Sequence, residues 1–168
     1  MLVQQFFVNG LAHSSYLLGG TNTCAIVDPR RDVDIYLEVA KAMEMKITHI
    51  LLTHLHADFV SGFMDLSEKT GAVIYAPEAG KCEYGHTALS EGSTFEIENL
   101  AVNVLETPGH TPEHITYVVT DLARSEDPAA IFCGDVLLVG DVGRLDPAAG
   151  NRHPACGICK RRGAGLPM

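Results

Sequence analysis

The residues of this chain with the clearest capacity for chemistry are histidines and aspartates that directly follow apolar runs. In the segment THLHADF, residues 53–59, His54 and His56 stand two apart and Asp58 follows two further on. The apolar run 47–52 comes immediately before this segment. Groups at the ends of strands splay into one crevice, where open α/β sheets usually place their ligands. A polar loop with surface histidines is the alternative interpretation of the segment taken by itself.

Two later segments have the same arrangement. In TPGHTPEH, residues 107–114, a Pro-Gly turn after an apolar run presents His110. We expect His114 in the same segment to be solvated or bonded to the backbone rather than to bind an ion. In FCGD, residues 132–135, Asp135 follows an apolar run and a glycine, with capping of a turn as its alternative role.

Taken together, the three segments predict a metal site in which His54, His110 and Asp135 converge on one ion. Two imidazoles and one carboxylate form the facial triad of non-haem Fe(II) sites, which leaves positions open for substrate and O2. The same ligands also suit a catalytic zinc ion that keeps a water. Ligand type by itself does not choose between the two metals.

The elements that must position these residues are mixed α and β, with strands in the majority. A sheet packed on a sheet, with helices outside, accommodates this order. One helix is predicted to begin after an N-cap at Asp32, and a second covers 60–70 and stops at Gly71. Residues 77–90 are predicted to form a loop. Strands are predicted at 3–8, 14–18 and 24–27, which form a meander, and at 47–52, 72–75, 94–97, 102–105, 115–119 and 130–133.

Composition limits the function classes. The 168 residues fit one domain, and 46% hydrophobic residues allow a real core. A net charge of -9 makes nucleic acid and anionic membranes poor partners. No signal peptide or membrane span is expected, because the N-terminus has no basic residue and polar residues interrupt 1–27. The five cysteines show no disulfide framework, so a reducing cytoplasm is the expected location.

The end of the chain differs from the rest. Residues 1–146 hold 8 basic and 21 acidic residues, a net charge of −13, whereas 147–168 hold four basic residues and no acid. This tail is rich in Gly, Pro, Ala and Cys without periodicity, and we expect it to be poorly ordered or loosely packed. The Cys156-Gly-Ile-Cys159 motif near His153 is only a weak metal or redox signal. We therefore divide the chain into a partial domain at 1–146 and an atypical tail at 147–168.

From about residue 2 to Asp146 the sequence resembles the metallo-β-lactamase superfamily. THLHAD, PGH, and GD followed by GR appear in the order expected for that family. The resemblance implies an α+β fold, an αββα sandwich with the metal site at one edge between the two sheets. The family's chain normally continues beyond this point, so the second half is expected to be incomplete, as a frameshift or a gene end would leave it.

Within the superfamily, Phe59 decides the branch. Dinuclear zinc members such as glyoxalase II carry T-H-x-H-x-D-H, and here Phe59, which cannot bind a metal, replaces the last histidine. THLHADFVSGF is most similar to persulfide dioxygenases and their rhodanese-fused relatives, which hold a single iron. The resemblance implies that His56 and Asp58 orient ligands and bound water. It also implies that Arg144 orients substrate or has a structural role, a surface ion pair being its alternative.

The expected activity is therefore that of a dioxygenase with one Fe(II) per chain. It would oxidise a low-molecular-weight thiol persulfide, such as glutathione persulfide, with O2 to give sulfite and the thiol. A rhodanese domain or partner is compatible with this branch. A zinc-dependent glyoxalase II-like thioester hydrolase is the alternative enzyme. A truncated, weakly active or inactive metal-binding remnant is the non-enzymatic alternative.

Overall fold

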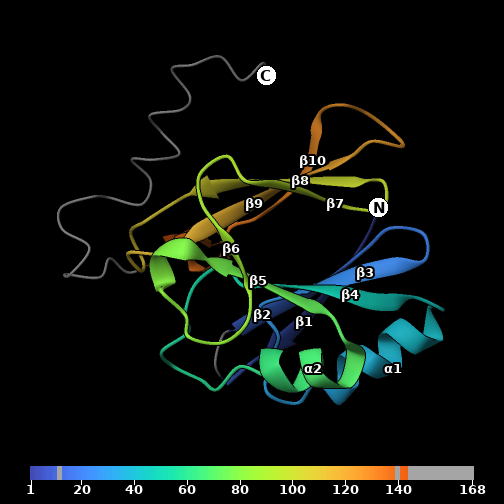
Figure 1. Ribbon diagram of the computed structural model, residues 1–168, viewed down its shortest axis with the longest axis horizontal. Helices are drawn as coiled ribbons and strands as arrows, with labels where there is room; N and C mark the ends of the chain where they lie inside the picture. Colours follow the sequence, from blue (N-terminus) through green and yellow to red (C-terminus); the bar gives the residue numbers. More distant parts are fainter. Residues whose placement is uncertain (11–12, 139–140, 144–168) are drawn as a thin grey trace.

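The computed structural model describes residues 1–10, 13–138 and 141–143, and two sheets packed face to face form its frame (Figure 1). In the larger sheet, β1–β2–β3 are antiparallel and confirm the predicted meander. The sheet then continues with parallel pairs from β3 to β6. In the order of the sheet, its strands are β1 (Leu2–Val8), β2 (His13–Gly19), β3 (Thr23–Val27), β4 (Lys46–Leu51), β5 (Val73–Pro77) and β6 (Thr87–Leu89).

The smaller sheet is antiparallel throughout and has the order β10–β9–β8–β7. A short hairpin of β11 (Leu137–Leu138) and β12 (Asp141–Val142) follows it. The strands of the four-stranded sheet are β7 (Thr94–Ile97), β8 (Leu100–Glu106), β9 (Ile115–Asp121) and β10 (Pro128–Phe132).

The side chains of β3 belong alternately to two hydrophobic cores, one on each face of the sheet. Side chains of a strand point alternately to opposite faces. Cys24 and Ile26 therefore join the core under the helices, whereas Ala25 and Val27 join the core between the sheets. All four side chains are buried. The central strands of this sheet are consequently apolar on both faces, as expected where both faces are covered.

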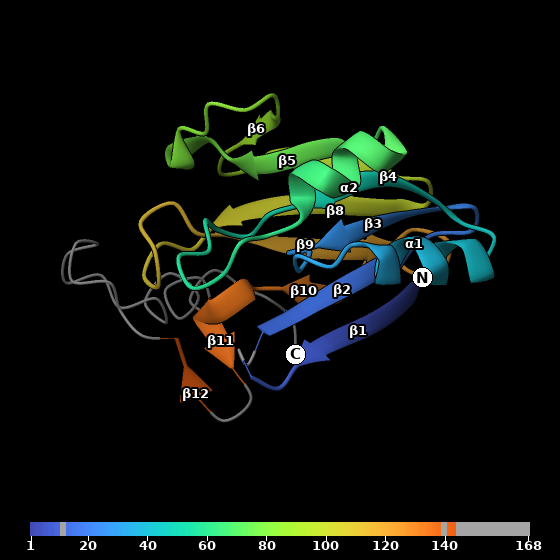
Figure 2. The same ribbon diagram turned by 90° about the horizontal axis from the view of Figure 1, so that it is seen from below.

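Two helices, α1 (Asp34–Ala42) and α2 (Phe63–Thr70), cover the outer face of the six-stranded sheet (Figure 2). This layering, with one mixed and one antiparallel sheet packed together, confirms the predicted fold class. The expected αββα arrangement has a second helical layer, on the outer face of the smaller sheet. The residues that the structure describes contain no helix there. Within the same residues, no helix is long and apolar enough to cross a membrane.

The helix boundaries correct two predictions. Asp32 does not cap α1, because its carboxylate accepts hydrogen bonds from the guanidinium of Arg30, and Val33 occupies the N-cap. The second helix begins at Phe63 rather than at 60, because the hydroxyl of Ser61 donates to the carbonyl of Pro29 (2.6 Å) and holds the connection outside the helix. Its end was predicted correctly, at a Gly71 with a φ of 73°.

Three short strands were not predicted. β6 lies inside the segment expected to be a loop, and β11 and β12 follow the last predicted strand. Strands of two or three residues are too short to show an alternating pattern. Only backbone pairing with a neighbour, such as that of β6 with β5, defines them.

The topology brings four strand ends to one edge of the sandwich. β3 and β4 are parallel, and β8 and β10 run in the same direction because both are antiparallel to β9. At this edge the N–H of Ile115 donates to the carbonyl of Thr53 (2.9 Å), and the hydroxyl of Tyr117 donates to the carbonyl of Leu52 (2.7 Å). These bonds join the end of β4 to the start of β9, and so one sheet to the other.

Replacing the buried Leu100 of β8 by alanine should destabilise the fold by about 2–5 kcal/mol, because the change leaves a cavity between the sheets. Urea unfolding measures the loss. Val60→Ala is the control: this side chain is 69% exposed, and its removal should change the free energy of unfolding by less than about 0.5 kcal/mol. Equal effects of the two substitutions would contradict this description of the core.

Candidate metal centre

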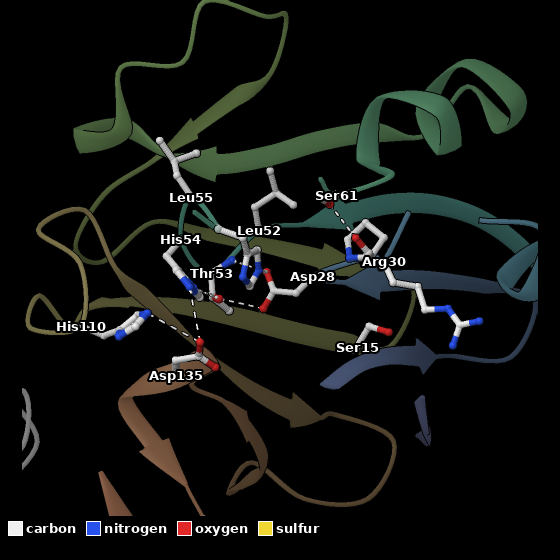
Figure 3. A network of polar contacts seen from close by, with 12 residues as sticks. Ser15, Asp28, Arg30, Leu52, Thr53, His54, Leu55, Ser61, His110 and Asp135 are labelled. Carbon is white, nitrogen blue, oxygen red and sulfur yellow. Dashed lines mark hydrogen bonds and ion pairs between the residues drawn. The ribbon is translucent and has the colours of Figure 1, made fainter. Parts of the chain in front are cut away.

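His54, His110 and Asp135 lie together at the edge where the strands end (Figure 3). His54 follows β4, His110 lies in the connection from β8 to β9, and Asp135 lies in a short 3-10 turn after β10. Oδ2 of Asp135 is 3.7 Å from Nε2 of His54 and 3.6 Å from Nε2 of His110. The ligand-type atoms of the three residues all lie within 4.8 Å of one another. The structure thus brings together the three residues that the sequence predicts to be ligands.

The separations fit a shared ion. The distances from Oδ2 of Asp135 to the two histidine nitrogens are longer than a hydrogen bond. Ligand atoms at 2.0–2.2 Å from one ion would lie about 3.0–3.5 Å apart. Movements of a few tenths of an ångström would bring the two separations from Asp135 into this range. The side chain of His54 is only 2% exposed, whereas those of His110 and Asp135 are 28% and 46% exposed. An ion held there would have protein on one side and access for a ligand on the other.

A chain of hydrogen bonds orients His54. The hydroxyl of Thr53 donates to Oδ2 of Asp28 (2.7 Å), so its oxygen is left to accept a proton from Nδ1 of His54 (2.9 Å). This tautomer leaves the lone pair of Nε2 directed toward Asp135. Burial, with a smaller contribution from the neighbouring His56 ring, lowers the pKa of His54 to about 4. A neutral imidazole with a free lone pair is the form that binds a metal.

Asp28, at the end of β3, is a site residue that the sequence did not identify. It is 3% exposed and also accepts the backbone N–H of Thr53 (2.8 Å). Burial by itself would raise the pKa of Asp28, but the contact with His56 and the nearby imidazoles lower the pKa to about 2. The available signal was a carboxylate directly after an apolar run, the same pattern that marks Asp135.

Of the three expected supporting residues, the structure describes two. Nε2 of His56 lies 3.5 Å from Oδ1 of Asp28, and the ring lies beside His54, with centroids 4.1 Å apart, without joining the converging group. Burial would lower the pKa of His56, but the contact with Asp28 and the charges of Asp28, Asp135 and Asp58 raise it. Asp58 itself is exposed.

Arg144 lies outside the described residues, and so does the tail at 147–168 with its cysteines and His153. The predictions made for these residues therefore stay predictions.

Phe59 fills the space beside His56. Its ring centroid lies 4.6 Å from that of His56 and 4.3 Å from that of His13. His13 is 8% exposed, and neither ring nitrogen has a hydrogen-bond partner among the described residues. The sequence did not mark His13, because a histidine at the start of a strand run has no ligand pattern around it.

A groove of about 440 Å³ adjoins the centre between β1–β2 and β10. Asp28, His56 and Asp135 line its polar end. Apolar side chains line much of the rest, among them Val3, Phe7, Ile131, Leu137 and Leu138. The groove is large enough for a small organic molecule whose reactive end reaches Asp135.

Asp28→Asn should weaken metal binding about 10–100-fold, because it removes the carboxylate that holds Thr53 and His54 in place. Competition between the protein and a chelator for Zn²⁺ measures the change in Kd. Asp127→Asn, at an exposed position in a turn far from the site, should leave the Kd unchanged. Equal Kd values for the two variants would contradict the orienting role of Asp28.

Gly134→Ala should cost at least about 2 kcal/mol of stability and impair metal binding. The φ of Gly134 is 46°, and an added Cβ would lie 2.4 Å from Oγ1 of Thr53 and 2.7 Å from Nε2 of His114. Thermal unfolding and zinc titration measure the two effects. Gly85→Ala is the matched control, since a Cβ there meets no atom within 4 Å. A stable, metal-binding Gly134→Ala variant would show that this packing does not constrain the site.

The sequence of this chain is similar to those of hydroxyacylglutathione hydrolases. The chain is 34% identical over 122 residues to hydroxyacylglutathione hydrolase of Pseudomonas aeruginosa (strain LESB58), which covers 73% of this chain and 45% of that protein. The enzyme of the same name from Francisella philomiragia is 30% identical over 151 residues, 89% of this chain and 57% of the relative. The chain thus spans about half the length of the curated relatives it matches.

Solved structures show the same fold. A metallo-beta-lactamase from Staphylococcus aureus subsp. aureus COL matches with a TM-score of 0.81 and 37% identity, over 88% of this chain and 47% of that one. ETHE1 from Myxococcus xanthus matches with a TM-score of 0.77 and 30% identity, over 86% of this chain and 61% of that one. The family model of the metallo-beta-lactamase superfamily matches residues 8–158. This chain therefore belongs to the metallo-β-lactamase superfamily.

Proposed function

We propose that this chain is the metal-binding part of a mononuclear iron persulfide dioxygenase. The substrate class is a low-molecular-weight thiol persulfide such as glutathione persulfide. In the overall reaction, persulfide, O2 and water give the thiol and sulfite. The terminal sulfur takes both atoms of O2 and one oxygen from water.

Phe59 is the observation that carries the proposal. In the dinuclear hydrolases of this superfamily, a histidine at this position binds the second metal. Here a phenyl ring packs between His56 and His13 and offers no ligand. His56 is turned toward Asp28 and lies outside the converging group of three residues, which supports a single ion at this site. The similarity to ETHE1, a persulfide dioxygenase, supports the same interpretation.

In the proposed enzyme, the residues of the site have separate roles. His54, His110 and Asp135 would hold the ion, and Asp28 keeps the lone pair of His54 directed at it through Thr53. The groove beside Asp135 has room for the organic part of a persulfide, and apolar side chains form much of its wall. Iron(II) bound there would supply the redox chemistry between O2 and sulfur.

Thioester hydrolysis by a zinc ion is the second candidate. Hydroxyacylglutathione hydrolases are among the relatives at 34–36% identity, and two histidines with one carboxylate also suit zinc. Both candidates use a substrate built on a thiol carrier, so the groove does not distinguish them. The metal and the reaction distinguish them, and a rhodanese domain or partner would accompany only the dioxygenase.

Protein purified without air should contain about one iron per chain and should consume O2 when glutathione persulfide is added, with sulfite as product. S-lactoylglutathione should be cleaved slowly or not at all. An oxygen electrode and a thioester assay measure the two activities. His110→Ala, which removes a ligand on the exposed side of the group, should lower O2 uptake at least about 100-fold.

Thioester cleavage without persulfide-dependent O2 uptake would favour the hydrolase. Absence of both activities, with metal retained, would favour a metal-binding remnant.

Phe59→His should raise zinc binding above one ion per chain, because an imidazole would replace the phenyl ring beside His56. Metal analysis after zinc loading and gel filtration measures the ratio. Phe59→Leu should stay at one, since leucine also offers no ligand. Two tightly bound zinc ions in the unsubstituted chain would contradict the role given to Phe59.

A further inference from the structure

His114 is a fully buried histidine that packs against the metal centre. It is 0% exposed, which corrects the expectation of a solvated side chain. Its Nδ1 is paired with Oγ1 of Thr107 (3.0 Å). Its ring is stacked on that of His54, with centroids 4.9 Å apart and an interplanar angle of 21°. The flat face of His114 thus supports the ring of the most buried of the three converging residues.

His114 also contacts the segments that carry Asp135 and His110. A Cβ at position 134 would lie 2.7 Å from Nε2 of His114, so the backbone next to Asp135 rests against the ring edge. The carbonyl of His114 accepts the N–H of Thr107 (2.8 Å) and closes the loop that presents His110. One side chain and its backbone therefore touch the supports of all three residues.

His114 does not join the converging group itself. Its Nε2 is buried without a hydrogen-bond partner among the described residues, and it faces Gly134 rather than the open side of the centre. Thr107, its partner through Nδ1, is in turn paired with Oγ1 of Thr116 (2.9 Å). This hydroxyl pair anchors the ring to the start of β9.

We propose that His114 is a positioning residue of the metal centre, whose ring fixes the orientation of His54 and the approach of the Gly134–Asp135 backbone. The inference rests on the metal centre of the proposed function, but it holds equally for iron and zinc. Functional groups must be held to about 0.5 Å by packed neighbours, and the stacked ring is the packed neighbour on this face of His54.

Cobalt(II) binding tests the proposal, because the visible spectrum of bound cobalt reports the arrangement of its ligands independently of catalysis. His114→Ala removes the ring. His114→Asn retains a polar group that can pair with Thr107 and so protects the fold. The control is Val119→Ala, a truncation at a fully buried position of β9 in the core between the sheets. Thermal unfolding of each apoprotein measures how far each change destabilises the chain.

We expect both His114 variants to bind cobalt at least tenfold more weakly than the unsubstituted chain and with an altered spectrum. Val119→Ala, at a similar loss of Tm, should change the Kd less than twofold and keep the spectrum. Tight binding with an unaltered spectrum in His114→Asn would overturn the proposal, as would an equal loss of affinity in Val119→Ala. Failure of the unsubstituted chain to bind cobalt would overturn the metal centre itself, and the role of His114 with it.

Discussion

The interaction between the carboxylate of Asp28 and Thr53 is the constraint on which this site depends. A buried charge is costly unless neighbouring groups compensate it. Here the compensation comes from the N–H and hydroxyl of Thr53 and from the ring of His56. Because these groups belong to the segment after β4, the charge at the end of β3 holds that segment in one place. The hydroxyl of Thr53 that compensates the charge of Asp28 also fixes the orientation of His54.

Thr53 is also where the two sheets meet. Its N–H and hydroxyl are bonded to Asp28, and its carbonyl accepts the N–H of Ile115 at the start of β9. The residue that sets the tautomer of His54 thus also joins its sheet to the smaller sheet, whose strand ends carry His110 and Asp135. The close contact at Gly134 closes the arrangement, since it brings the end of β10 against the same hydroxyl. The supports of His54, His110 and Asp135 therefore meet at Thr53.

The sequence predicted those parts of the structure that leave a local pattern. Alternation and turn residues located the longer strands, and ligand-type residues after apolar runs marked His54, His110 and Asp135. Asp28 also follows an apolar run, but only the parallel pairing of β3 with β4 places it beside Thr53 and His56, and the local pattern does not show that pairing. His114 was misjudged for a related reason: only the folding of its loop beneath His54 makes it a core residue. Asp32 has the residue type of a cap, but a neighbouring arginine competes for its carboxylate.

The outer strands of the two sheets have a consequence for handling the protein. Among the strands that the structure describes, β1 and β10 lie at the edges of their sheets, and they border the groove beside the metal centre. Near that groove Phe7 is 53% exposed, Ile131 60% and Leu138 51%. Unpaired strand edges flanked by exposed apolar side chains act as templates for pairing with other chains. We therefore expect this polypeptide, prepared by itself, to self-associate as its concentration rises, with the mouth of the metal centre as the first surface to be covered.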